Sequence, residues 1–120
     1  MRLSVLALVV GSVLLPIAQA SGQATEVQKL LPASGDPEDW FGHAVAISGD
    51  VAVVGAILDD QVGSDSGSAT VYHFDGAVWV EEQLLVPASL SAGDQFGRSI
   101  AVDGDVILIG SWLPQRRRLR

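Results

Sequence analysis

The chain has 120 residues, of which 48% are hydrophobic, with 14 acidic and 7 basic side chains and no cysteine. This length allows one small domain, and the hydrophobic content excludes a disordered chain. The net charge of −7 argues against a nucleic-acid partner, which needs a basic face, and the lack of cysteine excludes disulfides and thiolate chemistry.

Residues 1–20 have the pattern of a secretory signal peptide. Arg2 precedes an apolar run, and Ala18 and Ala20 are the small residues that a signal peptidase needs at −3 and −1. A transmembrane anchor is the alternative, but a span needs about 20 apolar residues and this run is shorter. We therefore expect cleavage after Ala20, no stable membrane span after cleavage, and a secreted, periplasmic or cell-surface location. Residues 21–28 are expected to form a linker.

An internal repeat follows the signal peptide. Residues 32–56 match residues 87–111 at 11 of 25 positions without a gap, so that Phe41 corresponds to Phe96. Repeats of this length are structural units that bury their apolar surfaces by stacking on one another. The motif residues to which we assign structural roles are Phe41, Gly42, Gly49, Asp50, Gly55, Phe96, Gly97, Gly104, Asp105 and Gly110.

The first half of each repeat has the pattern of two β-strands. Ala44–Ile47 predicts a short strand, and Val51–Ala56 is almost continuously apolar, as in a strand buried on both faces. A tight turn at Ser48-Gly49 is expected between them. Asp103-Gly104 is the stronger turn signal in the second copy, because glycine tolerates a positive φ.

The second half of the repeat adds a loop and two more strands. Asp59–Gly67 is polar and glycine-rich, and Ser68–Phe74 is rich in β-branched and aromatic residues, which predicts a strand. Asp75-Gly76 predicts a hairpin turn before Val78–Val86. This last strand is placed on the outside of the sheet because its Glu81-Glu82 pair needs water. No apolar period of 3.6 residues indicates a helix after the signal peptide.

Four antiparallel strands in each repeat match one blade of a β-propeller. We expect an all-β fold in which residues 29–86 form the first blade and residues 87–111 the first half of a second. Propellers need roughly four to eight blades, so about 1.5–2 blades make an incomplete propeller. A single sheet cannot bury both of its apolar faces, and the expected partners are therefore other blades or copies of the same chain.

The motifs resemble the FG-GAP repeat, the blade unit of integrin-α-type seven-bladed propellers that also occurs in bacterial exported proteins. The resemblance rests on Asp39-Trp40-Phe41-Gly42 and Val53-Val54-Gly55-Ala56, with Phe96-Gly97 and Gly110 in the second copy. It covers about residues 29–111 and implies a propeller used for recognition outside the cell.

Two features depart from the family pattern. Ile57 stands where the name-giving Gly-Ala-Pro has its proline. Many members carry a calcium loop between the first two strands, but Ser48-Gly49-Asp50 is too short to supply six to eight oxygen ligands. We therefore expect no calcium site and no cofactor.

Several polar and aromatic residues are weaker candidates for a site. Asp59, Asp60 and Asp65 share one loop and form either a displaced cation site or solvated loop acids. Their spacing lacks the terminal bidentate acid of calcium loops, which favours solvated acids.

His43 and His73 are far apart in the sequence and have no third ligand, which argues against a metal or catalytic role. The aromatic residues Trp40, Phe41, Trp79 and Phe96 form either a ligand platform or packing contacts. We favour packing between blades for the two repeated phenylalanines and a peripheral place for Trp40.

Residues 112–120 form an atypical basic tail in which Arg116–Arg120 contains four arginines. Such a tail either attaches to an anionic surface or arises from an out-of-frame read or truncated coding region. We favour the second interpretation, and with it a truncated fragment of a larger propeller protein.

Three functions remain open from the sequence. The first is an exported, non-catalytic binding or adhesion segment whose acidic loop contacts an extracellular protein or polysaccharide. The second is a structural repeat that assembles with itself and has no ligand of its own. The third is part of a hydrolase propeller, which we rank last because no nucleophile–base pair or metal cluster is visible.

Overall fold

The computed structural model describes residues 26–36 and 38–112. The predicted signal peptide and residues 113–120 of the basic tail lie outside these residues. Within the described part, no helix has the length and apolarity needed to cross a membrane.

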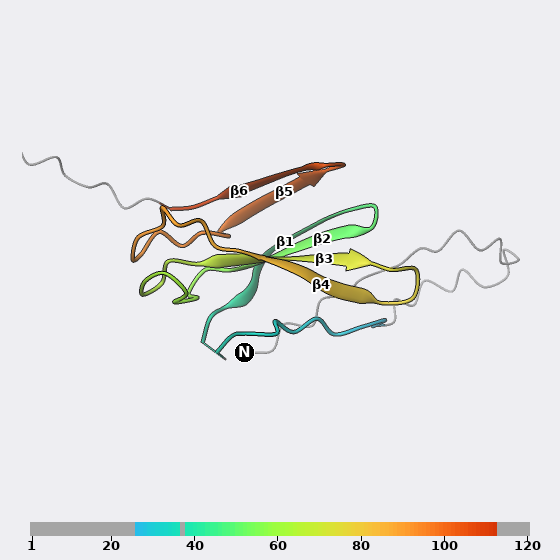
Figure 1. The fold of residues 1–120 in the computed structure, drawn as a ribbon, viewed down its shortest axis with the longest axis horizontal. Helices are drawn as coiled ribbons and strands as arrows, with labels where there is room; N and C mark the ends of the chain where they lie inside the picture. Colours follow the sequence, from blue (N-terminus) through green and yellow to red (C-terminus); the bar gives the residue numbers. More distant parts are fainter. Residues whose placement is uncertain (1–25, 37, 113–120) are drawn as a thin grey trace, which may run out of the picture.

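The described residues form six antiparallel strands in two sheets (Figure 1). The first sheet has the order β1-β2-β3-β4 and the second consists of β5 and β6. The expectation of an all-β fold built from four-stranded propeller-type blades is confirmed. The strands are β1 (Phe41–Ser48), β2 (Val51–Ala56), β3 (Ser68–Phe74), β4 (Trp79–Leu85), β5 (Ser99–Asp103) and β6 (Val106–Gly110).

The first strand is longer than its apolar pattern predicted. It begins at Phe41 rather than Ala44, because Phe41 pairs with Ala56 across β2. The pairing register shifts between Phe41 and Val45, and Gly42 lies in this irregular stretch with a φ of 90°. A bulge of this kind interrupts the alternation of inward and outward side chains, so the alternating pattern does not reveal the start of the strand. The fourth strand lies at the edge of the sheet, as its two glutamates predicted.

The hairpin turns between β1 and β2 and between β5 and β6 lie one residue later than predicted. Ser48 pairs with Val51, so Gly49-Asp50 is the two-residue loop, and Gly104-Asp105 is its equivalent in the second sheet. The predicted turns at Ser48-Gly49 and Asp103-Gly104 were wrong because the first residue of each still belongs to the strand ladder. Gly49 and Gly104 have φ values of 56° and 55° at the first loop position, as a type II′ turn requires.

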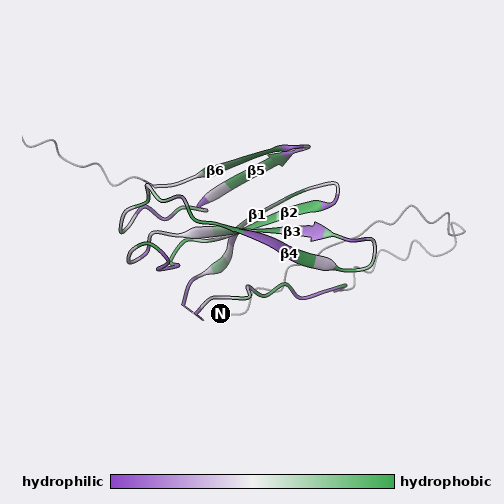
Figure 2. Ribbon diagram, in the orientation of Figure 1, coloured by the Kyte–Doolittle hydropathy of each residue, from purple (hydrophilic) through white to green (hydrophobic). Residues whose placement is uncertain are grey.

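The second sheet packs face to face on the first. Val53, Ala69 and Val71 are buried between the two sheets. The residues of the second sheet that cover them include Ile100 and Ile109. Figure 2 shows that apolar residues recur along the strands that meet there. This stacking buries one face of the first sheet, as expected of neighbouring blades.

Residues 26–36 cover part of the opposite face of the first sheet. Leu30 is only 2% exposed and packs in a cluster with Val54, Tyr72 and Trp79. The side-chain amide of Gln28 donates to the carbonyl of Trp79 at 2.9 Å and accepts from its backbone N–H at 2.8 Å, as a neighbouring strand would. The chain therefore covers some of the surface that we expected to need another blade. Gln28 also belongs to the segment that we expected to be a linker.

Candidate functional site

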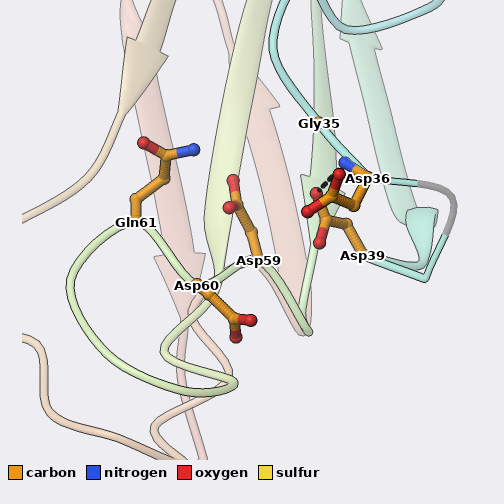
Figure 3. A pocket seen from close by; sticks show the side chains of 6 residues that line it. All are labelled: Gly35, Asp36, Asp39, Asp59, Asp60 and Gln61. Atoms are coloured by element: carbon orange, nitrogen blue, oxygen red, sulfur yellow. Dashed lines mark hydrogen bonds between the residues drawn. The ribbon is translucent and has the colours of Figure 1, made fainter.

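An acidic pocket lies at one end of the first sheet, away from the β1–β2 turn (Figure 3). It has a volume of about 320 Å³. The chain segments before β1 and after β2 meet there because the two strands are antiparallel neighbours. A hydrogen bond of 3.1 Å from the N–H of Leu58 to the carbonyl of Asp39 joins them. The lining residues are Gly35, Asp36, Asp39, Asp59, Asp60 and Gln61.

Asp39 is the buried acid on the β1 side of the pocket. Its Oδ2 accepts a hydrogen bond of 2.7 Å from the N–H of Asp36, and its own N–H donates to the carbonyl of Asp36 at 3.1 Å. Burial raises the pKa of Asp39 above its usual value, and the hydrogen bond from Asp36 opposes this shift. The carboxylates of Asp59, Asp36 and Asp60 raise the pKa further.

Asp59 organises the loop on the β2 side. Its Oδ2 accepts a hydrogen bond of 2.5 Å from the hydroxyl of Ser68, and its carbonyl accepts one of 2.9 Å from the N–H of Gly67. Asp59 is only 4% exposed, so the expectation of a solvated acid was wrong at this position, where Ser68 takes the place of water. The expectation holds for Asp60 and Asp65, which are exposed and linked by a 2.7 Å bond from the N–H of Asp65 to Oδ1 of Asp60.

The pocket concentrates negative charge at an open end of the fold. Asp36 and Asp60 present exposed carboxylates beside two buried ones. Among the described residues, no group of three His, Asp or Glu side chains has an arrangement that could hold a metal ion. The chemistry that suits such a pocket is the contact of carboxylates with an ammonium or guanidinium group of a partner.

Asp36 and Asp39 were not among the site residues predicted from the sequence. Asp39 recurs as Asp94 in the second copy, and there its Oδ2 accepts a 2.7 Å bond from the N–H of Ser91. The recurrence of one loop geometry shows that this aspartate first of all shapes the chain before a Phe-Gly pair. Asp39 also belongs to an acidic cluster with Asp59 and Asp60. No sequence motif indicates that these residues lie together.

Two of the repeated glycines, Gly55 and Gly97, lie where the two sheets touch. A Cβ on Gly55 would overlap the carbonyl oxygen of Gly97 and lie 2.9 Å from its carbonyl carbon. Phe96 forms an isolated bridge with Gly67 and donates its N–H to the carbonyl of Ser66 at 2.8 Å. The Phe-Gly motif of the second copy thus binds backbone to backbone on the first blade.

The Phe-Gly motif has the same backbone conformation in both copies. Gly42 and Gly97 have φ values of 90° and 94°, and the preceding Trp40 and Gln95 have left-handed values of 54° and 48°. Phe96 packs in the cluster between the sheets. Phe41 packs instead in the cluster that contains Leu30, and its ring makes an edge-to-face contact with Tyr72 at 6.4 Å between centroids.

The remaining candidates are scattered over the fold. His43 and His73 are exposed on β1 and β3, with β2 between them, and do not form one site. Trp79 is 5% exposed in the core and Trp40 is half exposed, so the aromatic residues do not form one platform.

The motif residues at the turns have local roles. Asp50 and Asp105 are exposed turn residues. Gly110, the counterpart of Gly55, lies against the side chain of Ser99 rather than against backbone.

The comparison with protein families identifies the chain. The FG-GAP repeat matches residues 24–72 and 79–118. The starts of the two matches, at positions 24 and 79, have the same offset as Phe41 and Phe96. The chain therefore belongs to the FG-GAP repeat family, whose members are typically propeller elements of binding and adhesion proteins. The repeat itself is of a non-enzymatic type. No curated protein and no solved structure matches the chain.

Proposed function

We propose that this chain is an exported, non-catalytic FG-GAP repeat protein that binds an extracellular protein through the loops at one end of its first sheet. The acidic pocket carries the proposal, because the chain segments before β1 and after β2 converge there around a cavity. Export rests on the signal-peptide pattern of residues 1–20.

The charge of the pocket defines the chemistry of the partner. The exposed acids Asp36 and Asp60 stand beside the buried acids Asp39 and Asp59, and the whole chain carries a net charge of −7. A lysine or arginine side chain of a partner protein complements this field and relieves the repulsion among the carboxylates. A neutral polysaccharide does neither, so we favour a basic protein surface over the polysaccharide.

The test measures binding of a lysine- and arginine-rich peptide and of dextran, a neutral polysaccharide, by isothermal titration calorimetry. The double variant Asp36→Asn/Asp60→Asn should weaken peptide binding by about tenfold. The matched control, Asp103→Asn/Asp105→Asn, removes the same charge from exposed residues at the opposite end of the strands. It should change the affinity by less than about twofold, because charges a Debye length away are largely screened.

Two results would contradict the proposal. Equal weakening by both double variants would show that only net charge matters. Tight binding of dextran, unaffected by the pocket variant, would place recognition elsewhere. The proposal that the chain is non-catalytic is tested separately. Turnover of peptide, ester or glycoside substrates by the purified chain would refute it.

A further inference from the structure

The outer face of the second sheet is apolar and bare. Val106 is 57% exposed and Leu108 is 67% exposed, both on β6. Their neighbours on the same strand, Ile107 and Ile109, point the other way and pack on the first sheet. A strand with apolar residues on both faces is typical of a sheet that is covered on both sides.

The repeat shows what this outer face corresponds to. Val106 and Leu108 occupy the positions of Val51 and Val53 in the first blade. Val53 is 0% exposed because the second sheet covers it. The outer face of the second sheet is therefore the equivalent of a surface that, one repeat earlier, binds another blade.

The complementary surface lies on β1 of the same chain. Ile100 and Val102 of β5 provide part of the contact with the first sheet. Their counterparts one repeat earlier are Val45 and Ile47, which are 51% and 58% exposed. Each chain thus presents both halves of the contact that already joins its own two sheets.

The N-terminal segment leaves this surface of β1 free. Leu30 covers β2, β3 and β4 through its cluster with Val54, Tyr72 and Trp79. Leu30 is also the counterpart, one repeat earlier, of Leu85 on β4. Leu85 packs in the cluster between the two sheets, and Leu30 packs in the equivalent cluster on the opposite face of the first sheet. The segment therefore lies where the edge strand of a preceding blade would lie, beside the place that β5 and β6 of another copy would fill.

From these equivalences we infer that two copies of this chain bind head to tail, with Val106 and Leu108 of one copy packed on Val45 and Ile47 of the next. The contact repeats the geometry of the interface between the first and second sheets. It is heterologous, so in a bound pair one copy still offers its β1 face and the other still offers the outer face of its second sheet, and the association extends beyond two. The inference does not depend on the acidic pocket or on its ligand.

Light scattering coupled to size-exclusion chromatography of the purified chain tests this contact over a range of concentrations. The mass of the unsubstituted chain should rise with concentration. Ile47→Asp and Leu108→Asp should each raise the dissociation constant by about tenfold or more, because each buries a charge at the centre of the contact. Val80→Asp is the matched control, since Val80 is 47% exposed on β4 and lies outside both surfaces.

A mixture of the two variants provides the decisive measurement. Ile47→Asp retains the outer face of the second sheet, and Leu108→Asp retains the β1 face. An equimolar mixture should therefore form a dimer that neither variant forms alone. Circular dichroism of each variant confirms that it is folded.

A chain that stays monomeric at every concentration would overturn the inference. So would a mixture that remains monomeric, or an association that Leu108→Asp abolishes and Ile47→Asp leaves intact. That last result would show a symmetric contact between two second sheets.

Discussion

The contact between Gly55 and Gly97 leads to a prediction that compares two copies of one motif position. Gly55 lies on β2 of the first blade, and Gly110 is its counterpart on β6. A Cβ at Gly55 would overlap the backbone carbonyl of Gly97, whereas a Cβ at Gly110 would overlap only the hydroxyl of Ser99. A hydroxyl can rotate away, but a backbone at the interface between two sheets cannot.

The expected cost follows from these distances. In Gly55→Ala the new methyl group would lie 2.9 Å from the carbonyl carbon and 3.1 Å from the Cα of Gly97, although ordinary contacts begin at 3.4 Å. The two sheets must separate locally, and a gap of about 0.5–1 Å forfeits a quarter to a half of each dispersion contact. Overpacking of this kind destabilises by about 2–3 kcal/mol. Gly110→Ala should cost less than about 1 kcal/mol, because alanine also lowers the entropy of the unfolded chain.

Urea unfolding followed by tryptophan fluorescence measures the difference. With a slope of about 1.5 kcal/mol/M, Gly55→Ala should lower the midpoint by about 1.3–2 M. Gly110→Ala should leave it within about 0.7 M of the unsubstituted chain. Equal midpoints for the two alanine variants would refute the reasoning, because the sheets would then not meet at Gly55.

Three further perturbations test other parts of the fold. Leu30→Ala should destabilise by about 2 kcal/mol in urea unfolding, the lower end for a buried leucine because the segment can collapse onto the sheet; Leu31→Ala, at a position 59% exposed, is the control and should have little effect. Asp39→Asn should stabilise the chain at pH 7 and not at pH 3, as thermal unfolding across pH would show. The raised pKa of Asp39 means that the folded state favours the protonated form, so stability is lost as pH rises through its folded-state pKa; an unchanged pH profile would contradict this. Hydrogen bonds from the N–H groups of Val78 and Ala77 lower the pKa of Asp75 in the folded state, so the unsubstituted chain keeps this stability at pH 7 and loses it as pH falls through that pKa. Asp75→Asn should therefore be less stable than the unsubstituted chain at pH 7. Equal thermal stability of both chains at pH 7 would argue against this.

The sequence predicted strand bounds correctly where the local residue types alone determine them. The bounds of β2 and β3 matched because runs such as Val51–Ala56 carry their β-propensity locally. The turns were displaced by one residue because glycine marks a positive φ but not which neighbour still pairs in the ladder. The start of β1 was missed because a bulge breaks the alternation on which the prediction depends.

The candidate site was only half visible in the sequence. The loop acids Asp59 and Asp60 were recognised as a cluster, whereas Asp36 and Asp39 were not joined to them. The two groups are separated by the whole β1–β2 hairpin and meet only because its strands run antiparallel. The burial of Asp59 likewise depends on Ser68, which lies at the far end of the loop.

The repeat, the all-β fold and the family were thus determined by the sequence alone, because repetition and β-propensity can be read directly along the chain. Only the tertiary structure decided which side of each strand is covered. Val53 and Leu108 occupy the same position of the repeat, yet one is 0% and the other 67% exposed. The difference arises because burial depends on what lies across the sheet, and that neighbour comes from a distant part of the chain.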